Sequence, residues 1–103
     1  MANYIFAYSG GNGLPADDAE RDAVMAKWGQ WFGQIGSAVV DGGGPTATAK
    51  TVRKGGSVGD GGSLGLTGYS IVAANSLDEA VELAKGCPAL EGGGAVDVYA
   101  IAT

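Results

Sequence analysis

The sequence predicts an α+β fold in which two helices cover one face of a four-stranded antiparallel sheet. Two segments have helical periodicity, at residues 17–35 and 76–87. Short apolar segments rich in β-branched and aromatic residues stand before, between and after them, as expected for strands. Most of the 20 glycines fall between these segments, where they indicate turns.

The first strand is predicted at residues 3–8, where aromatic side chains (Tyr4, Phe6 and Tyr8) occupy one face and aliphatic side chains the other. Both faces of this strand are therefore apolar. A strand of this kind is typical of a sheet that is covered on both sides.

The first helix is predicted at residues 17–35, with acidic residues in its opening turns, where they complement the helix dipole. Gly29 and Gly33 border its apolar stripe, and each costs about 1 kcal/mol relative to alanine inside a helix. We therefore expect another chain segment to approach the helix closely there. Gly36 suits the C-cap. The apolar stripe consists of Val24, Met25, Trp28, Trp31, Phe32 and Ile35.

The middle of the chain predicts extended structure interrupted by glycines. Residues 37–41 form a second predicted strand, which residues 42–45 end. The threonine-rich segment 46–53 predicts an edge ribbon or an arm. Turns are expected at 55–56 and at 59–62, and residues 64–74 form the next strand, with its inner part at 68–74.

The second helix has a capping box, with Ser76 at the N-cap and Glu79 three positions later. Pro88 ends it, and residues 95–101 predict the last strand. The element order is the split βαβ, or ferredoxin-like, arrangement. The buried stripe of this helix is expected to be Leu77, Ala80, Val81 and Ala84, with Cys87 at its end.

The second face of such a sheet would be too apolar to stay in water, whichever side of the first strand the helices cover. A large exposed apolar face usually marks an interface. We therefore expect a homodimer that packs sheet to sheet, as a dimeric α/β barrel does.

Composition narrows the classes of partner and compartment. A chain of 103 residues fits a single domain, residues 1–103. The net charge is −5 and the six basic residues are scattered, so duplex nucleic acid and anionic membranes are not expected partners. Neither a signal peptide nor a membrane span is evident. Cys87 is the single cysteine, which fits a reducing compartment, and a cytoplasmic location is expected.

No metal or cofactor is expected. Histidine is absent and the carboxylates are scattered, which leaves no zinc site. Residues 11–16 match a G-x-G-x-x-A pattern between a strand and a helix, and Asp41 stands where a ribose-binding acid would. However, Pro15 and the polar residues after it delay the helix, and the chain lacks the further βαβ units of a dinucleotide-binding fold. A flexible turn explains this segment better.

The order of motifs resembles the YCII-related (DGPF) domain family along nearly the whole chain. The resemblance implies a single YCII-like domain and a dimeric α/β barrel built from ferredoxin-like halves. The residues that carry it are Trp28, Gln30-Trp31, Asp41-Gly42-Gly43, Thr46 to Arg53, Asp60-Gly61, Gly68 to Ala74, Ser76 to Ala80, Ala84 to Pro88 and Val96-Asp97-Val98.

This chain departs from the family pattern at the signature itself. Gly62-Ser63 replaces the Pro-Phe that follows Asp60-Gly61, and the next stretch is shortened to residues 64–67. Some relatives carry a His-Asp pair proposed to be catalytic, which cannot be carried over to a chain without histidine.

Two functions are compatible with these residues. The first is a small protein that binds or transforms a small organic molecule, in a cleft between sheet and helix or across the dimer. The alternative is a non-catalytic dimerisation or accessory module, favoured by the absence of histidine, of a reactive cysteine and of paired acids. Whether the chain is an enzyme stays open.

The polar and aromatic residues named for the first function also have ordinary structural interpretations. Aspartates beside glycines suit turns, strand tyrosines suit sheets, and tryptophans three residues apart suit a core. The candidate acid or base groups are Asp60, Asp41 and Tyr8, and the candidate ligand-binding groups are Trp28, Arg21, Arg53 and Tyr69.

Overall fold

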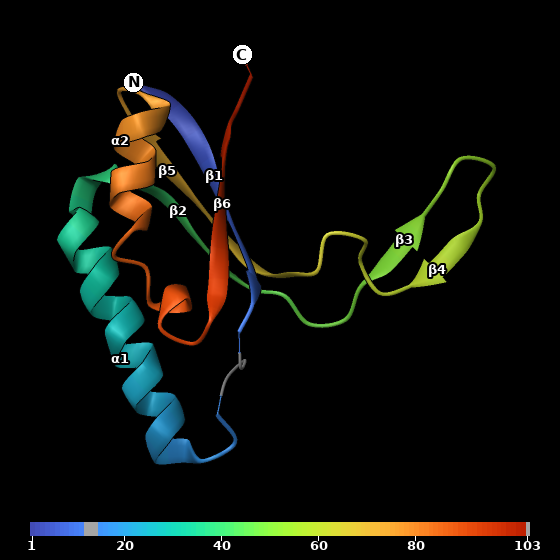
Figure 1. Cartoon of the computed structure of the whole chain (residues 1–103), viewed down its shortest axis with the longest axis horizontal. Coiled ribbons are helices and arrows are strands. Elements are labelled where there is room, and N and C mark those ends of the chain that lie inside the picture. The colour runs from blue at the N-terminus through green and yellow to red at the C-terminus, as the bar shows by residue number, and fades with distance from the viewer. Residues whose placement is uncertain (12–14, 103) are drawn as a thin grey trace.

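The computed structural model describes residues 1–11 and 15–102 and shows an α+β fold (Figure 1). Single turns of 3₁₀ helix follow the helices at Gly36–Ala38 (η1) and Pro88–Leu90 (η2). The other elements are β1 (Ala2–Gly10), α1 (Asp18–Ile35), β2 (Val39–Pro45), β3 (Lys50–Val52), β4 (Val58–Asp60), β5 (Leu66–Ala74), α2 (Leu77–Ala84) and β6 (Gly94–Ala100).

Four strands form one sheet in the order β2-β5-β1-β6, and all neighbouring strands are antiparallel. The predicted antiparallel sheet is therefore confirmed, with β1 and β5 at its centre. The two edges differ in regularity. β6 follows β1 without a register shift, whereas β2 shifts twice along β5, between Val39 and Asp41 and between Asp41 and Gly44.

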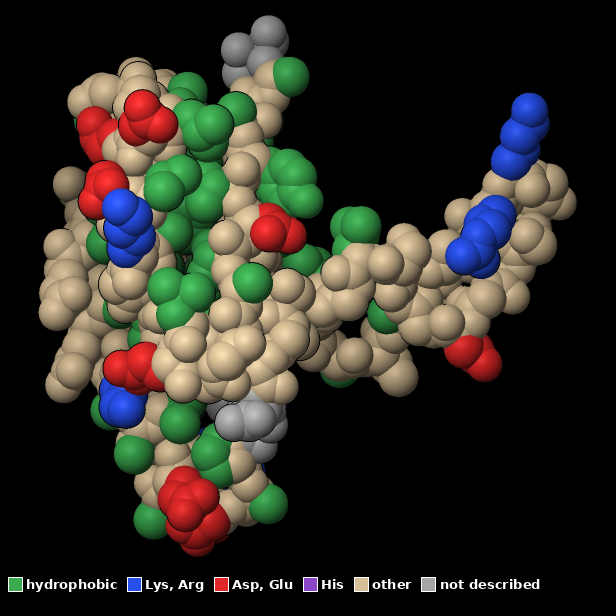
Figure 2. Space-filling model, viewed as in Figure 1, with side chains coloured by type: hydrophobic (Ala, Val, Ile, Leu, Met, Phe, Trp, Pro, Cys, Tyr) green, Lys and Arg blue, Asp and Glu red, His purple; other side chains and the backbone are tan. Residues whose placement is uncertain are grey.

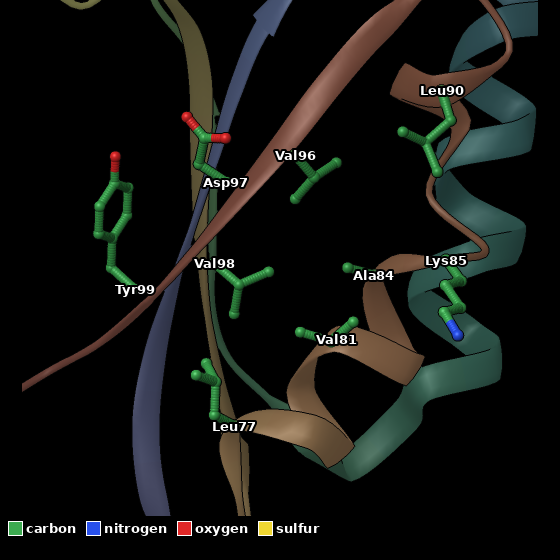
Figure 3. Close-up of a pocket in the computed structure, with 9 residues that line it drawn as sticks. All are labelled: Leu77, Val81, Ala84, Lys85, Leu90, Val96, Asp97, Val98 and Tyr99. Carbon is green, nitrogen blue, oxygen red and sulfur yellow. The ribbon is translucent and has the colours of Figure 1, made fainter.

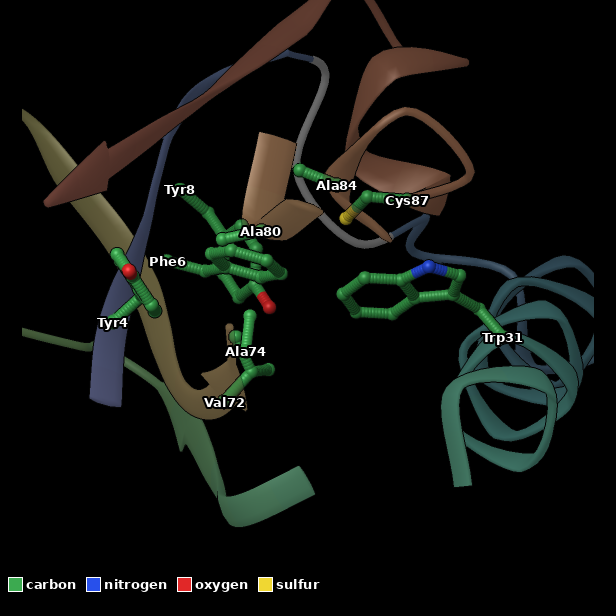
Figure 4. Close-up of a cluster of buried hydrophobic side chains, with 9 residues drawn as sticks. All are labelled: Tyr4, Phe6, Tyr8, Trp31, Val72, Ala74, Ala80, Ala84 and Cys87. Carbon is green, nitrogen blue, oxygen red and sulfur yellow. The ribbon is translucent and has the colours of Figure 1, made fainter. Parts of the chain in front are cut away.

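Both helices lie on the same face of this sheet, on the left in Figure 1. The core fills the space between the two layers (Figure 4). Trp31 is the buried side chain of α1, and Ala80 and Ala84 are those of α2. The side chains that the sheet and the η2 region add to this core are Tyr4, Phe6, Tyr8, Val72, Ala74 and Cys87.

Both helices begin at side-chain N-caps, of which the one at Ser76 was predicted. The Asp17 carboxylate accepts the Glu20 backbone N–H at 3.2 Å, and the Ser76 hydroxyl accepts the Glu79 backbone N–H at 3.1 Å. These side chains satisfy backbone donors that the first helical turn leaves free. The Glu79 carboxylate accepts from the Asn75 side-chain amide, at 3.2 Å. Gly36 ends α1 with a φ of 53°, as predicted.

The expectation that residues 42–45 end the second strand is wrong, because β2 continues through them to Pro45. The strand instead bulges, and Gly43 adopts a φ of 67°. A Cβ atom on Gly43 would lie 1.9 Å from the Tyr69 carbonyl oxygen. Here a glycine allows close approach between two strands, whereas the sequence suggested a turn.

The expected close approach at Gly29 and Gly33 is also wrong. A Cβ atom added to either glycine would meet nothing within 4 Å. Both glycines are exposed on α1, and no segment of the described chain crosses the helix at either of them.

A second small sheet pairs β3 with β4, aligning Lys50 with Asp60 and Val52 with Val58. This hairpin lies in residues 46–65, which we call the arm. The arm leaves the end of the main sheet on the side opposite the helices (Figure 1). The segment 46–53 was expected to be a ribbon or an arm, and it forms the arm's first half. β4 was not predicted, and its last two residues fall in the turn predicted at 59–62.

Candidate functional site

The space between the sheet and α1 is filled by aromatic side chains. The ring centroids of Tyr8 and Trp28 lie 5.0 Å apart in an edge-to-face arrangement, and those of Phe6 and Trp31 lie 6.1 Å apart and are stacked. The indole N–H of Trp31 donates to the Leu83 carbonyl oxygen at 3.1 Å, which connects the two helices. Contacts of this kind are those of a packed core, and they leave no room for a ligand between these rings.

The Tyr8 hydroxyl, a candidate acid or base, is part of a buried hydrogen-bond chain. It donates to the Ser70 Oγ at 2.7 Å, and the Ser70 hydroxyl donates to the Gly42 carbonyl oxygen at 2.8 Å. Burial raises the pKa of Tyr8 above its ordinary value, although the bond to Ser70 acts in the opposite direction. This hydroxyl therefore stays protonated and connects strands.

Cys87 lies in the core, as predicted. Burial raises the pKa of its thiol to about 11, and a hydrogen bond from the backbone of Ala89 only partly offsets this effect. The thiolate is the nucleophilic form of cysteine, so this thiol is an inert core group near neutral pH.

The remaining candidate residues lie in separate places. Arg21 pairs with Asp18 in the first turns of α1. The Asp41 carboxylate accepts the Gly43 backbone N–H at 2.8 Å, a contact that stabilises the bulge of β2. Asp60 accepts from Lys50 at 2.8 Å on the arm, where Arg53 also lies.

The structure thus brings candidates together only in pairs. Tyr8 and Trp28 touch in the core, and Asp60 and Arg53 share the arm. Asp41 and Tyr69 lie on the neighbouring strands β2 and β5. These three pairs and Arg21 lie in different parts of the molecule and do not converge on one cavity. Catalysis by general acids and bases requires convergence of such groups on a reacting atom.

Three surface features stand out instead, and the first is the sheet face opposite the helices, which we call the open face. Side chains alternate along a strand, so the neighbours of the buried residues point to this face. Ile5 is aligned with Ile71 on one side and with Tyr99 on the other. The further residues of the open face are Ala7, Asp41, Tyr69, Ala73 and Asp97.

The second feature is a groove of about 510 Å³ between α2, η2 and β6, which we call the edge groove. Leu77 and Val81, expected to be buried, line it and are 47% and 38% exposed. They stay exposed because β6 is an edge strand, and within residues 1–11 and 15–102 no further strand lies beyond it to cover them. Val96 and Val98 point from β6 toward α2, and Asp97 and Tyr99 project from the other side of the strand (Figure 3).

The third feature is the arm. Figure 2 shows hydrophobic side chains along the strip between α2 and β6, and basic side chains near the far end of the arm. The arm holds three of the six basic residues (Lys50, Arg53 and Lys54) but one of the eleven acidic residues, Asp60. Large apolar side chains on the arm and at its base, Val52, Val58, Leu64 and Leu66, are exposed.

Sequence reasoning did not identify the edge groove or the apolar side chains of the arm as candidate sites. The signal for the groove was present, since α2 carries a stripe wide enough to extend past the sheet. The sequence did not show the strand order, which places β6 at the edge of the sheet and leaves Leu77 and Val81 of the α2 stripe uncovered.

No protein-family model matches this sequence, and a search of curated proteins finds no match. Within residues 1–11 and 15–102, no three side chains of metal-binding type gather where they could hold an ion. In the same part of the chain, no helix has both the length and the apolar character needed to cross a bilayer. The G-x-G-x-x-A pattern lies partly at residues 12–14, outside the described residues.

Proposed function

We propose that this chain is a non-catalytic self-association module, in which two copies pack open face to open face. The observation that carries this proposal is an apolar sheet face, centred on Ile5 and Ile71, that no helix of the described chain covers. An apolar face of this kind is stable in water when another surface covers it. A second copy offers the same self-complementary patch, as two-fold dimers require.

The strand order supports a more specific form of this proposal. The first and third sheet strands lie at the centre, and the second and fourth at the edges. This order is that of the ferredoxin-like split βαβ, and two such units packed face to face make a dimeric α/β barrel. The chain is then a single YCII-like domain over residues 1–103, as its resemblance to the YCII-related (DGPF) family suggests.

The proposal is tested by sedimentation velocity at micromolar concentration, comparing wild type with Ile71→Lys. The wild type should sediment as a dimer and the variant as a monomer, because a lysine ammonium in the interface would be desolvated without a partner. Met25→Lys is the matched control, since Met25 is exposed on α1, away from the sheet. It should remain dimeric.

Circular dichroism should show that the lysine variants keep the fold. Tyr69→Lys, at a more exposed position of the same face, is a second variant that carries less risk to the monomer. A wild type that stays monomeric at these concentrations, or an Ile71→Lys variant that stays dimeric, would refute the proposal.

A second candidate function is small-molecule binding. The space between sheet and helices is packed, but the edge groove, at about 510 Å³, falls within the size range of ligand sites. A thermal-shift screen with small carbonyl and aromatic metabolites tests it, since a ligand that binds only the native state raises the apparent stability. A ligand whose effect is lost in Val81→Lys would favour this function.

A further inference from the structure

Beyond its base, the arm has no supporting strand among the residues that the structure describes. β3 and β4 pair with each other and not with the main sheet. A single two-stranded hairpin is marginally stable in water unless a third strand or another surface supports it. Val52 and Val58, directly opposite each other, are 69% and 60% exposed. The arm therefore has an apolar side that requires a surface from elsewhere.

The charges of the arm are also incompletely matched. Lys50 pairs with Asp60 at 2.8 Å, whereas Arg53 and Lys54 form no ion pair with any residue that the structure describes. Outside the arm, the chain holds three basic and ten acidic residues. The arm of one copy is thus complementary in charge to the body of another.

The β6 edge has the matching properties. It is a regular edge strand, and its outer backbone groups lack a neighbouring strand among the described residues. Such an edge is a template for strand addition. The edge groove beside it is lined by Leu77, Val81 and Leu90. Asp97, on β6, is exposed and has no ion-pair partner in the described part of the chain.

We propose, building on the homodimer proposed above, that the arm of each copy docks along β6 of its partner. One hairpin strand extends the partner's sheet by backbone hydrogen bonds, and Val52 and Val58 cover the edge groove. Arg53 and Lys54 then lie near the partner's Asp97. The arm projects away from the helix layer, toward the side where a copy bound to the open face would sit (Figure 1).

Carbodiimide cross-linking of the wild-type protein tests whether Lys54 of one copy touches Asp97 of the other. The reagent joins a lysine side chain to a carboxylate only where the two groups are in contact. A mixture of ¹⁴N- and ¹⁵N-labelled protein should give a Lys54–Asp97 link with mixed isotope masses, which shows that the link joins two copies. A Lys54–Asp97 link found only within one copy, or no such link in a proven dimer, would overturn the docking site.

Sedimentation equilibrium measures how much the docked arm contributes to the affinity of the dimer. Arg53→Gln combined with Lys54→Gln should raise the dimer dissociation constant roughly tenfold, and more at low salt than at high salt. The control, Arg21→Gln combined with Lys27→Gln on α1, has the same net charge and should change the constant less than twofold. Val52→Ser combined with Val58→Ser should also weaken the dimer.

The outcomes separate the two proposals. A monomeric wild type would refute both the homodimer and the docked arm. A dimer that depends on Ile71 but responds equally to the arm variant and to the control would overturn the docked arm alone.

Discussion

At the scale of single residues, the Tyr8 and Ser70 hydroxyls hold three strands together. Tyr8 lies on β1, Ser70 on β5 and the acceptor carbonyl of Gly42 on β2. Ser70 is the buried polar residue of an otherwise apolar core, and it both accepts and donates. The chain of bonds therefore satisfies every polar atom involved, as burial requires.

Ser70→Ala should lower the free energy of unfolding by about 1–3 kcal/mol, since it leaves the buried Tyr8 hydroxyl without an acceptor. Tyr8→Phe should cost less, about 1 kcal/mol, because Ser70 keeps its bond to Gly42. Urea denaturation measures both values. Ser63→Ala, on the exposed arm, is the control and should have no measurable effect. A loss for Ser70→Ala no larger than that for Tyr8→Phe would contradict this account.

Tyr8 shows what could and could not be predicted about the site at this scale. Alternation along the first strand correctly placed Tyr4, Phe6 and Tyr8 on one face. That the hydroxyl would meet Ser70 depends on a pairing between residues 62 positions apart. Local pattern does not specify such a pairing, so a buried structural hydroxyl and a catalytic one are indistinguishable from sequence.

At the scale of elements, the two helices follow their sequence signals because the signals are local. Ser76 caps the second helix as predicted, and each helix ends within a turn of its predicted glycine or proline. Strand β2 was predicted less well, since its glycines serve a bulge against β5 rather than a turn. Glycine has the same appearance in sequence in both roles, and only the neighbouring strand distinguishes them.

Gly29→Ala and Gly33→Ala should each stabilise the protein, by up to about 1 kcal/mol, because alanine reduces the conformational freedom of the unfolded chain and its Cβ meets nothing in the helix surroundings. Thermal denaturation followed by circular dichroism measures the gain. Gly43→Ala is the contrasting variant and should destabilise, owing to its positive φ and the nearby Tyr69 carbonyl. Destabilisation by either helix substitution would show that a surface packs against α1 there.

At the scale of the whole molecule, a compact two-layer body carries the arm as a long excursion between β2 and β5 (Figure 1). The principal extents of 44 × 42 × 20 Å reflect this shape. At the base of the arm, the Thr46 backbone N–H donates to Thr67 at 3.0 Å, and the Thr46 hydroxyl donates to Leu66 at 2.8 Å. These two hydrogen bonds hold the first residue of the arm beside the start of β5. The sequence predicted the layers, but not how far the arm would project.

Replacing residues 48–63 by a short Asn-Gly turn should leave the body folded, because the core includes no residue of the arm. The far-ultraviolet circular dichroism should keep its helical signal, and the melting temperature measured at high dilution should change by only a few degrees. If this variant no longer unfolded cooperatively, the arm would be shown to belong to the core. The substitution Ser63→Ala serves again as a reference for the intact arm.

The unequal regularity of β2 and β6 limits the kind of assembly that this molecule can build. Bulges, three consecutive glycines and a terminal proline make β2 a poor template for strand addition, whereas β6 is a regular edge strand. In the proposed pair, each arm covers the β6 edge of its partner, so that among the described residues no regular sheet edge is left uncovered for a third copy. Under the proposed docking, growth is expected to stop at a closed pair, without any residue dedicated to preventing fibre formation.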